Sequence, residues 1–201
     1  MQENTFVLSD ETGACIIIDA GCYSRAEKKM LEVYISSNNL IPQKLIMTHC
    51  HFDHVLGSRF VAKLYNLSVE AHKLDIPILE NAHNHGLLHG LDVEEPPDIK
   101  VYLDEDKLVR FGNSELKIFH VPGHSPGSIA FYSKEQKFVI VGDVLFNGSI
   151  GRTDLPYASY DQLQKSIFTK LMTLPPETEV YPGHGPSTTI HAEALSNPFL
   201  I

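Results

Sequence analysis

The chain has 201 residues, of which 43% are hydrophobic and 20% are charged, and its formal net charge is −9. This length and composition are typical of one globular domain that buries a core without disulfide support. The acidic balance argues against a general nucleic-acid binder, because phosphate binding usually requires a basic surface. It also argues against a basic helix lying on a membrane surface.

The three cysteines, Cys15, Cys22 and Cys50, form no paired framework. An odd number of cysteines is typical of reduced thiols in the cytoplasm. The N-terminus shows no charged-then-apolar leader, and no apolar run approaches membrane-spanning length. We therefore expect a cytoplasmic protein.

The first half of the chain alternates short apolar runs with helical patterns. Ser24 is placed to cap the first helix. The least regular stretch, residues 81–98, contains His83, His85 and His89, for which we expect a polar loop with solvated histidines. A flap over a cleft and a second metal site are the alternatives. Strands are expected over residues 5–8, 15–18, 44–47 and 68–71, and helices over about 24–36, 55–64 and 73–81.

The second half of the chain has a mainly β pattern from Val101 onward. Strands dominate the middle while helices are spread along the chain, which predicts an α/β protein whose sheet faces are covered by helices. Strands are expected over residues 107–111, 115–121, 128–132, 137–141 and 179–181, a long loop over 142–159, and helices over about 160–174 and 187–195.

Three histidines and an aspartate lie within six residues directly after a short apolar run. In an extended segment alternate side chains point the same way, so we expect His49, His51 and Asp53 on one side. Cys50 then faces the opposite side, where a packing role is expected. His54 follows as the chain turns into a helix. Imidazoles beside a carboxylate suit zinc or another borderline transition metal.

Three further candidate ligands, His124, Asp143 and His184, each follow a predicted strand beside glycine or proline. Such a rigid backbone at a strand end provides the pre-organisation that a metal site requires. Taken singly, Asp143 could cap a turn, and the two histidines could make hydrogen bonds behind a ligand. Together with the first motif, the seven groups suffice for two metal ions.

This ordered set of ligands resembles the metallo-β-lactamase superfamily over nearly the whole chain. Within it, the two Pro-Gly-His loops, residues 148–154 and the tail 197–200 resemble the short bacterial members of the glyoxalase II group, the hydroxyacylglutathione hydrolases. The resemblance implies one catalytic domain over residues 1–201 with an αββα fold, in which two mixed sheets lie face to face with helices outside. Relatives usually begin with a short strand before residues 2–5, so the first sheet is expected to lack an edge strand.

The resemblance also implies two divalent ions, zinc in the first place, with iron or manganese tolerated by the same ligands. Two such ions, about 3.5–4 Å apart, share a water and lower its pKa toward neutrality, and the resulting hydroxide attacks the substrate carbonyl. Asp53 and Asp143 are the carboxylates expected at the catalytic centre. One ion is assigned to His49, His51 and His124, the other to Asp53, His54 and His184, and Asp143 bridges both.

The implied substrate is S-D-lactoylglutathione or a related thioester. A thiolate leaves readily, whereas an amide nitrogen requires a proton donor that the chain does not clearly supply. Arg152 stands where the longer glyoxalase II enzymes carry a basic residue that contacts glutathione, and an ion pair with Asp154 is the alternative. Tyr157 is the candidate replacement for a substrate-binding tyrosine. The chain shows no counterpart of the C-terminal helical domain of those enzymes, so glutathione is expected to bind weakly, or the substrate is another thioester.

Two other functions fit the same pattern. A persulfide dioxygenase uses one iron on this scaffold and resembles the chain in its Gly-Arg-Thr-Asp segment. A non-catalytic metal-binding scaffold is the second alternative. For partners we expect a small-molecule thioester, no nucleic acid and no membrane, and the protein itself as a monomer or small homo-oligomer.

Overall fold

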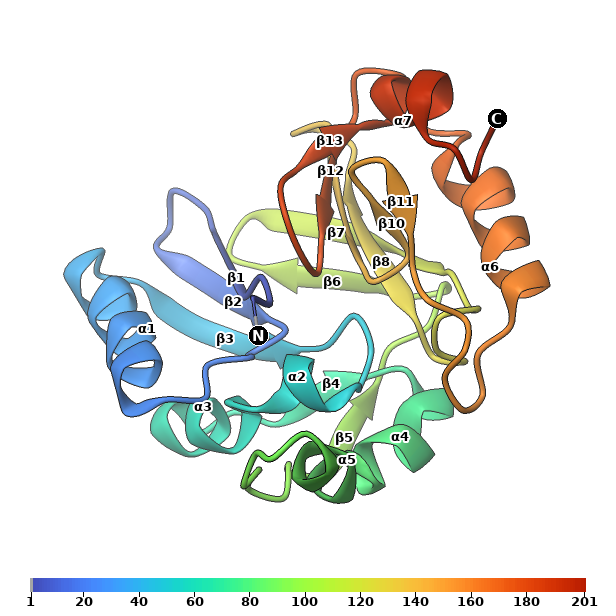
Figure 1. Cartoon of the computed structure of the whole chain (residues 1–201). Coiled ribbons are helices and arrows are strands. Elements are labelled where there is room, and N and C mark those ends of the chain that lie inside the picture. The colour runs from blue at the N-terminus through green and yellow to red at the C-terminus, as the bar shows by residue number, and fades with distance from the viewer. Residues whose placement is uncertain (1) are drawn as a thin grey trace. The chain divides into compact units, whose positions relative to one another are not determined.

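The structure, a computed structural model, describes residues 2–201, which fall into two units (Figure 1). The first unit comprises residues 3–103 and 110–115, and the second comprises residues 2, 104–109 and 116–201. Each unit has its own mixed sheet and its own apolar core. The prediction of one catalytic domain over the whole chain stays a prediction.

The sheet of the first unit has the strand order β1-β2-β3-β4-β5. Only the first pair is antiparallel, and the other neighbours run parallel. Every residue of β2 is buried, as expected for a strand covered on both faces. Because parallel strands end at the same edge, the residues that follow β2 and β3 meet there. The strands are β1 (Phe6–Ser9), β2 (Ala14–Ile18), β3 (Ile41–Ile46), β4 (Val69–Ala71) and β5 (Ile99–Tyr102).

The helices of the first unit begin with α1 (Arg25–Ser37), whose start matches the prediction. Ser24 accepts a hydrogen bond from the backbone of Glu27, and the Glu27 carboxylate accepts one in return from Ser24 N, which completes a capping box. None of the helices over residues 2–201 is long and apolar enough to cross a membrane. The others are α2 (Phe52–Val55), α3 (Ser58–Tyr65), the 3-10 turn η1 (Lys73–Asp75), α4 (Ile76–Glu80) and α5 (Ala82–Leu88).

Two predictions for this unit are wrong. The helix expected over residues 55–64 is two helices, and the first begins already at Phe52. Strand alternation therefore ends at His51 and does not place Asp53. The loop expected over residues 81–98 contains α5, which buries Ala82 and Gly86 and contacts α2.

The six-stranded sheet, which belongs to the second unit except for residues 110–111 of β6 and 114–115 of β7, has the order β13-β12-β9-β8-β7-β6. β9 and β12 run parallel, whereas β12 and β13, β8 and β9, and β7 and β8 pair antiparallel. Gly183 N donates to Gly142 O at 2.8 Å, so the residues that follow β9 and β12 come together at one edge. The strands are β6 (Leu108–Phe111), β7 (Ser114–His120), β8 (Ile129–Ser133), β9 (Phe138–Gly142), β12 (Glu179–Pro182) and β13 (Thr188–Thr189).

The long loop predicted over residues 142–159 contains a small hairpin of β10 (Leu145–Phe146) and β11 (Ser149–Ile150). The helix predicted over about 160–174 is α6 (Tyr160–Ser166), continued by a π turn, η2 (Ile167–Leu171). The last helix, α7 (Ile190–Ser196), follows β13. Leu163, Ile167, Leu171 and Ile190 are buried in the core of this unit.

Candidate metal centre

A buried carboxylate, Asp19, organises the ligand corner of the first unit. It directly follows β2 with φ of 52°, a left-handed conformation that aspartate tolerates. Its Oδ1 accepts from Thr48 N at 2.7 Å, and its Oδ2 accepts from Thr48 Oγ1 at 2.6 Å. The same Oδ2 lies 3.1 Å from Nδ1 of His54. Asp19 therefore ties the end of β2 to the loop after β3 and to α2.

These contacts decide which ring nitrogen carries the proton in two histidines. Asp19 is an acceptor only, so Nδ1 of His54 is assigned as the donor. The Thr48 hydroxyl donates a hydrogen bond to Asp19. Its oxygen is therefore free to accept a hydrogen bond from Nδ1 of His49 at 3.1 Å. Both histidines are then left with a lone pair on Nε2, the state that a metal ligand requires.

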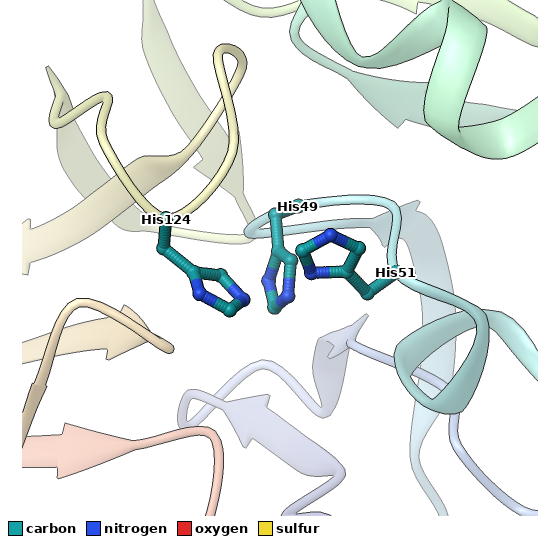
Figure 2. Close-up of side chains that lie close together, drawn as sticks. All are labelled: His49, His51 and His124. Atoms are coloured by element: carbon teal, nitrogen blue, oxygen red, sulfur yellow. The ribbon is translucent and has the colours of Figure 1, made fainter. Parts of the chain in front are cut away.

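His51 and Asp53 complete this corner. His51 immediately precedes α2 in an extended conformation, and its ring meets the ring of His49 edge-on at 4.9 Å between centroids. Asp53 lies in the first turn of α2. Asp75 Oδ2 accepts from Cys50 N at 2.8 Å and so holds the loop between the two histidines. Figure 2 shows the rings of His49 and His51 as sticks.

Cys50 is fully buried in the apolar core of the first unit. Burial raises the pKa of its thiol well above the ordinary value. A buried neutral thiol is a poor metal ligand and a poor nucleophile. The predicted packing role of Cys50 is confirmed.

The second unit has a matching arrangement around Asp143, which directly follows β9. Its Oδ2 lies 3.6 Å from Nε2 of His124 and 3.5 Å from Nε2 of His184. The opposite ring nitrogens face backbone carbonyls: Nδ1 of His124 lies 2.9 Å from Arg152 O, and Nδ1 of His184 lies 2.6 Å from Gln2 O. A carbonyl only accepts, so Nδ1 is again the protonated nitrogen and Nε2 carries the lone pair.

Close backbone approach fixes the two loops that carry these groups. A Cβ at Gly151 would lie 1.9 Å from Asp143 O and 3.2 Å from Cβ of His124. A Cβ at Gly123, where φ is 140°, would lie 2.2 Å from Leu163 N. Glycine is thus required at both positions. His120 adds a side-chain contact, with Nε2 at 2.9 Å from Pro126 O in the loop of His124.

A model of the "Metallo-beta-lactamase superfamily" matches residues 1–184 of this sequence. The chain belongs to the metallo-β-lactamase superfamily. Its fold is accordingly the metallo-β-lactamase fold, with mixed sheets and flanking helices, as predicted from the motifs. Members of this superfamily bind metal ions and include hydrolases, so the chain is assigned to the metallo-hydrolases.

The relatives of this superfamily member carry several different names. The "Probable metallo-hydrolase YqgX" of Bacillus subtilis is 38% identical over 197 residues, which cover 97% of this chain and 90% of the relative. The "Hydroxyacylglutathione hydrolase GloC" of Haemophilus influenzae is 34% identical, with coverage of 99% and 93%. Among solved structures, "TTHA1623 in a di-iron-bound form" has a TM-score of 0.88 at 41% identity, covering 99% and 96% of the two chains. "BLEG-1 B3 metallo-beta-lactamase" has a TM-score of 0.90 at 34% identity, covering 98% and 94%.

The donor set in the chain fits the metals of the superfamily. Asp19, His49 and His54 form one group whose candidate ligand atoms lie within 4.8 Å of one another. Within this group Asp19 is the hydrogen-bond acceptor for Thr48 and His54, so Nε2 of His49 and Nε2 of His54 are the atoms left to bind a metal. Imidazole nitrogens with carboxylate oxygens suit zinc, iron and manganese. Asp19 was not among the predicted site residues, although its signal is the same as that of Asp143: a carboxylate directly after an apolar strand.

The two predicted substrate-binding residues lie on the surface after β11. Arg152 pairs with Asp154 through two hydrogen bonds of 2.8 Å, so the ion pair considered as an alternative is formed. This pairing lowers the pKa of Asp154 to about 2. Tyr157 is exposed, with φ of 67°. A role for Arg152 and Tyr157 in substrate binding stays a prediction.

Glu3 is a buried acid near the candidate ligands that the sequence patterns did not single out. Its Oε2 accepts from Thr5 Oγ1 at 3.0 Å, and its Oε1 lies 3.9 Å from Nδ1 of His54. Burial raises the pKa of this carboxyl to about 9, which outweighs the opposing effect of His54. Burial therefore favours the neutral form of this acid.

The three histidines of residues 81–98 contact other residues of the first unit, and His89 is exposed as expected while His83 and His85 are half-buried. His83 Nδ1 lies 2.5 Å from Val93 O. Phe52 stacks on His89 with 5.0 Å between ring centroids and meets His85 edge-on at 5.2 Å. None of these histidines belongs to a metal-competent group among residues 2–201. Their contacts instead hold α5 against α2, the helix that carries Asp53 and His54.

Proposed function

We propose that the chain is a thioesterase of the glyoxalase II type, which cleaves S-D-lactoylglutathione or a related thioester with two divalent ions. One observation carries the proposal: an oxygen faces Nδ1 of His49, His54, His124 and His184, so each offers Nε2 as a metal ligand. The relative named as a hydroxyacylglutathione hydrolase, with which the chain aligns over nearly its whole length, supports this activity.

The proposed ligand sets follow the candidate groups of the chain. His49, His51 and His124 would hold one ion through three imidazole nitrogens. Asp53, His54 and His184 would hold the other ion. Asp143 would be a ligand of both, which the position of its Oδ2 near Nε2 of His124 and His184 supports. Zinc, iron and manganese all accept these donors, and a neighbouring structure is titled as di-iron-bound.

When bound, such ions supply a hydroxide at neutral pH and polarise the substrate carbonyl. The other residues of the chain orient the proposed metal ligands. Asp19 and Thr48 keep Nε2 of His49 and His54 unprotonated, and two backbone carbonyls do the same for His124 and His184. A thiolate leaves without a proton, so this reaction needs no dedicated general acid, and Asp53 and Asp143 serve as ligand carboxylates.

The test combines metal content with turnover. Protein purified without chelator is analysed by elemental mass spectrometry and assayed with S-D-lactoylglutathione. We expect two metals per chain together with turnover of S-D-lactoylglutathione. The variant His51→Ala should lose both metal content and turnover. One iron, no turnover and oxygen uptake with glutathione persulfide would identify a dioxygenase instead. Full metal content without either reaction would indicate a non-catalytic scaffold. A β-lactam serves as the comparison substrate, because one structural neighbour is titled as a B3 metallo-β-lactamase.

A further inference from the structure

A cavity of about 570 Å³ lies in the first unit beside the candidate ligands. Its walls come from β1, α1, the loop after β2, and Asp53 of α2. This volume is typical of sites that bind small molecules, which usually occupy about 300–1,000 Å³. The cavity is a candidate binding site for the part of a substrate that does not react.

Most of the wall is apolar or aromatic. The apolar residues include Val7 of β1 and Leu31 of α1. Three large side chains in the wall are open to solvent, with exposed fractions of 71% for Met30, 51% for Tyr34 and 37% for Tyr23. Core packing does not account for their exposure, and clustered exposed apolar side chains commonly mark a binding site.

The polar groups in the wall are largely engaged with the protein. The Glu27 carboxylate accepts from the backbone nitrogens of Tyr23 and Ser24. The Thr5 hydroxyl donates to Glu3 and accepts from Gly21 N at 3.0 Å. Recognition of a polar ligand needs groups that can exchange water for the ligand, and the Glu27 carboxylate and the Thr5 hydroxyl are already committed. Oε1 of Glu3 is the exception, because it is buried without a hydrogen-bond partner among the described residues. With most of its lining apolar or aromatic, the wall as a whole favours an apolar ligand.

The charge of the wall points the same way. Its ionisable acids are Glu3, Glu27 and Asp53, and the wall residues, all within the described part of the chain, include no lysine, arginine or histidine. An anionic group such as the glutathione moiety would find no opposite charge in the cavity. An uncharged group meets no such penalty.

We infer that this cavity binds the uncharged, apolar acyl chain of a thioester. That the chain is an acyl group rests on the proposed thioesterase function, because Asp53 is both a wall residue and a proposed metal ligand. The preference for an uncharged apolar ligand rests on the cavity alone. Among the thioesters that the proposed function covers, the inference favours those with an apolar acyl group over S-D-lactoylglutathione, whose acyl group carries a hydroxyl.

Binding can be tested without turnover, by calorimetric titration of the full chain with N-methylalkanamides of four, six and eight carbons. Each methylene that enters the wall is expected to tighten binding by up to about fourfold. The variant Met30→Glu, which places a charge in the wall, should remove this dependence on chain length. Val33→Glu is the matched control, since Val33 is also exposed on α1 but does not line the cavity. It should bind as the unsubstituted chain does.

Two results would overturn the inference: affinity that does not rise with chain length, or equal affinity in both variants. A second copy of the chain packed over the cavity is a different occupant, and would show as a dimer that binds no amide. Hydrolysis of S-acyl-N-acetylcysteamine thioesters, from acetyl to octanoyl, separates this inference from the proposed function. Turnover of the acetyl ester that does not become faster with longer acyl chains would refute only the inference that the cavity binds the acyl chain. Amide binding without any turnover would refute only the thioesterase.

Discussion

The substitution Asp19→Asn tests whether a single carboxylate sets the protonation of two proposed ligands. The side chain keeps its size, and its oxygen can still accept from Thr48 N. Its new NH₂ group takes the place of Oδ2. In the unsubstituted chain Oδ2 accepts from Thr48 Oγ1 and faces Nδ1 of His54. A donor in that place forces His54 Nδ1 to accept, so the ring proton moves to Nε2. The Thr48 hydroxyl must also turn, and it then donates to Nδ1 of His49.

The expected magnitude follows from this reversal. Disturbing the partner behind a metal-bound histidine usually lowers metal affinity about 10–100-fold, which corresponds to about 1.4–2.7 kcal/mol. Because one substitution reverses the bonds of both His49 and His54, we expect the upper end of this range. Asp19→Ala is less informative, since it leaves three buried donors without their acceptor at about 1–3 kcal/mol each and risks unfolding.

The assay is competition for zinc with a chromophoric chelator, paired with ¹⁵N NMR of the imidazole rings. Glu193→Gln is the matched control: Glu193 is equally buried and accepts from Gly148 N, Thr188 Oγ1 and Asn197 Nδ2, none of which is a proposed ligand. The control should lose stability but not zinc affinity. An Asp19→Asn protein that binds zinc within twofold of the unsubstituted chain, with its protons still on Nδ1, would refute the reasoning.

Three further predictions concern stability. Gly151→Ala places a methyl group against Asp143 O and should cost about 1–3 kcal/mol in urea unfolding; unchanged stability would contradict the close approach. Burial raises the pKa of Glu3 from 4.5 to about 9, so the folded state binds the proton more tightly. Stability should fall as pH rises from about 4.5 to 9, and Glu3→Gln should abolish this slope in thermal unfolding; an equal slope in both proteins would argue against a buried acid. His89→Ala should lose about 0.5–1.5 kcal/mol of stacking on Phe52, and His89→Phe should retain it; equal melting temperatures for the two variants would count against the stack.

Local sequence signals predicted the parts of the fold that depend on neighbours in the chain. The start of α1 was predictable because Ser24 and Glu27 form a complete capping box within four residues. The positions at which β3 and β9 end were predictable because the apolar run of each strand is followed by polar residues. The carboxylate Asp19 follows the same rule after β2, and lacked only a neighbouring histidine in sequence to single it out.

The parts that were missed depend on contacts between distant residues. The break between α2 and α3 falls at Gly57, where a Cβ would lie 2.3 Å from Sγ of Cys22. No periodic pattern reveals that contact. α5 has glycine inside the helix, which lowers its intrinsic helix propensity. A Cβ at Gly86 would lie 2.1 Å from the Val93 side chain, so the glycine serves close packing with a segment that follows the helix.

Arg152 makes two independent contacts, one through its backbone and one through its side chain. The carbonyl of Arg152 holds the imidazole, while its guanidinium extends to Asp154 at the surface. A carbonyl is common to all twenty amino acids, so residue 152 can change its side chain without disturbing the ring behind it. The side chain at this position can then change independently of the backbone contact to His124. The side chain at residue 152 can therefore vary during evolution, while the backbone contact that orients His124 is kept.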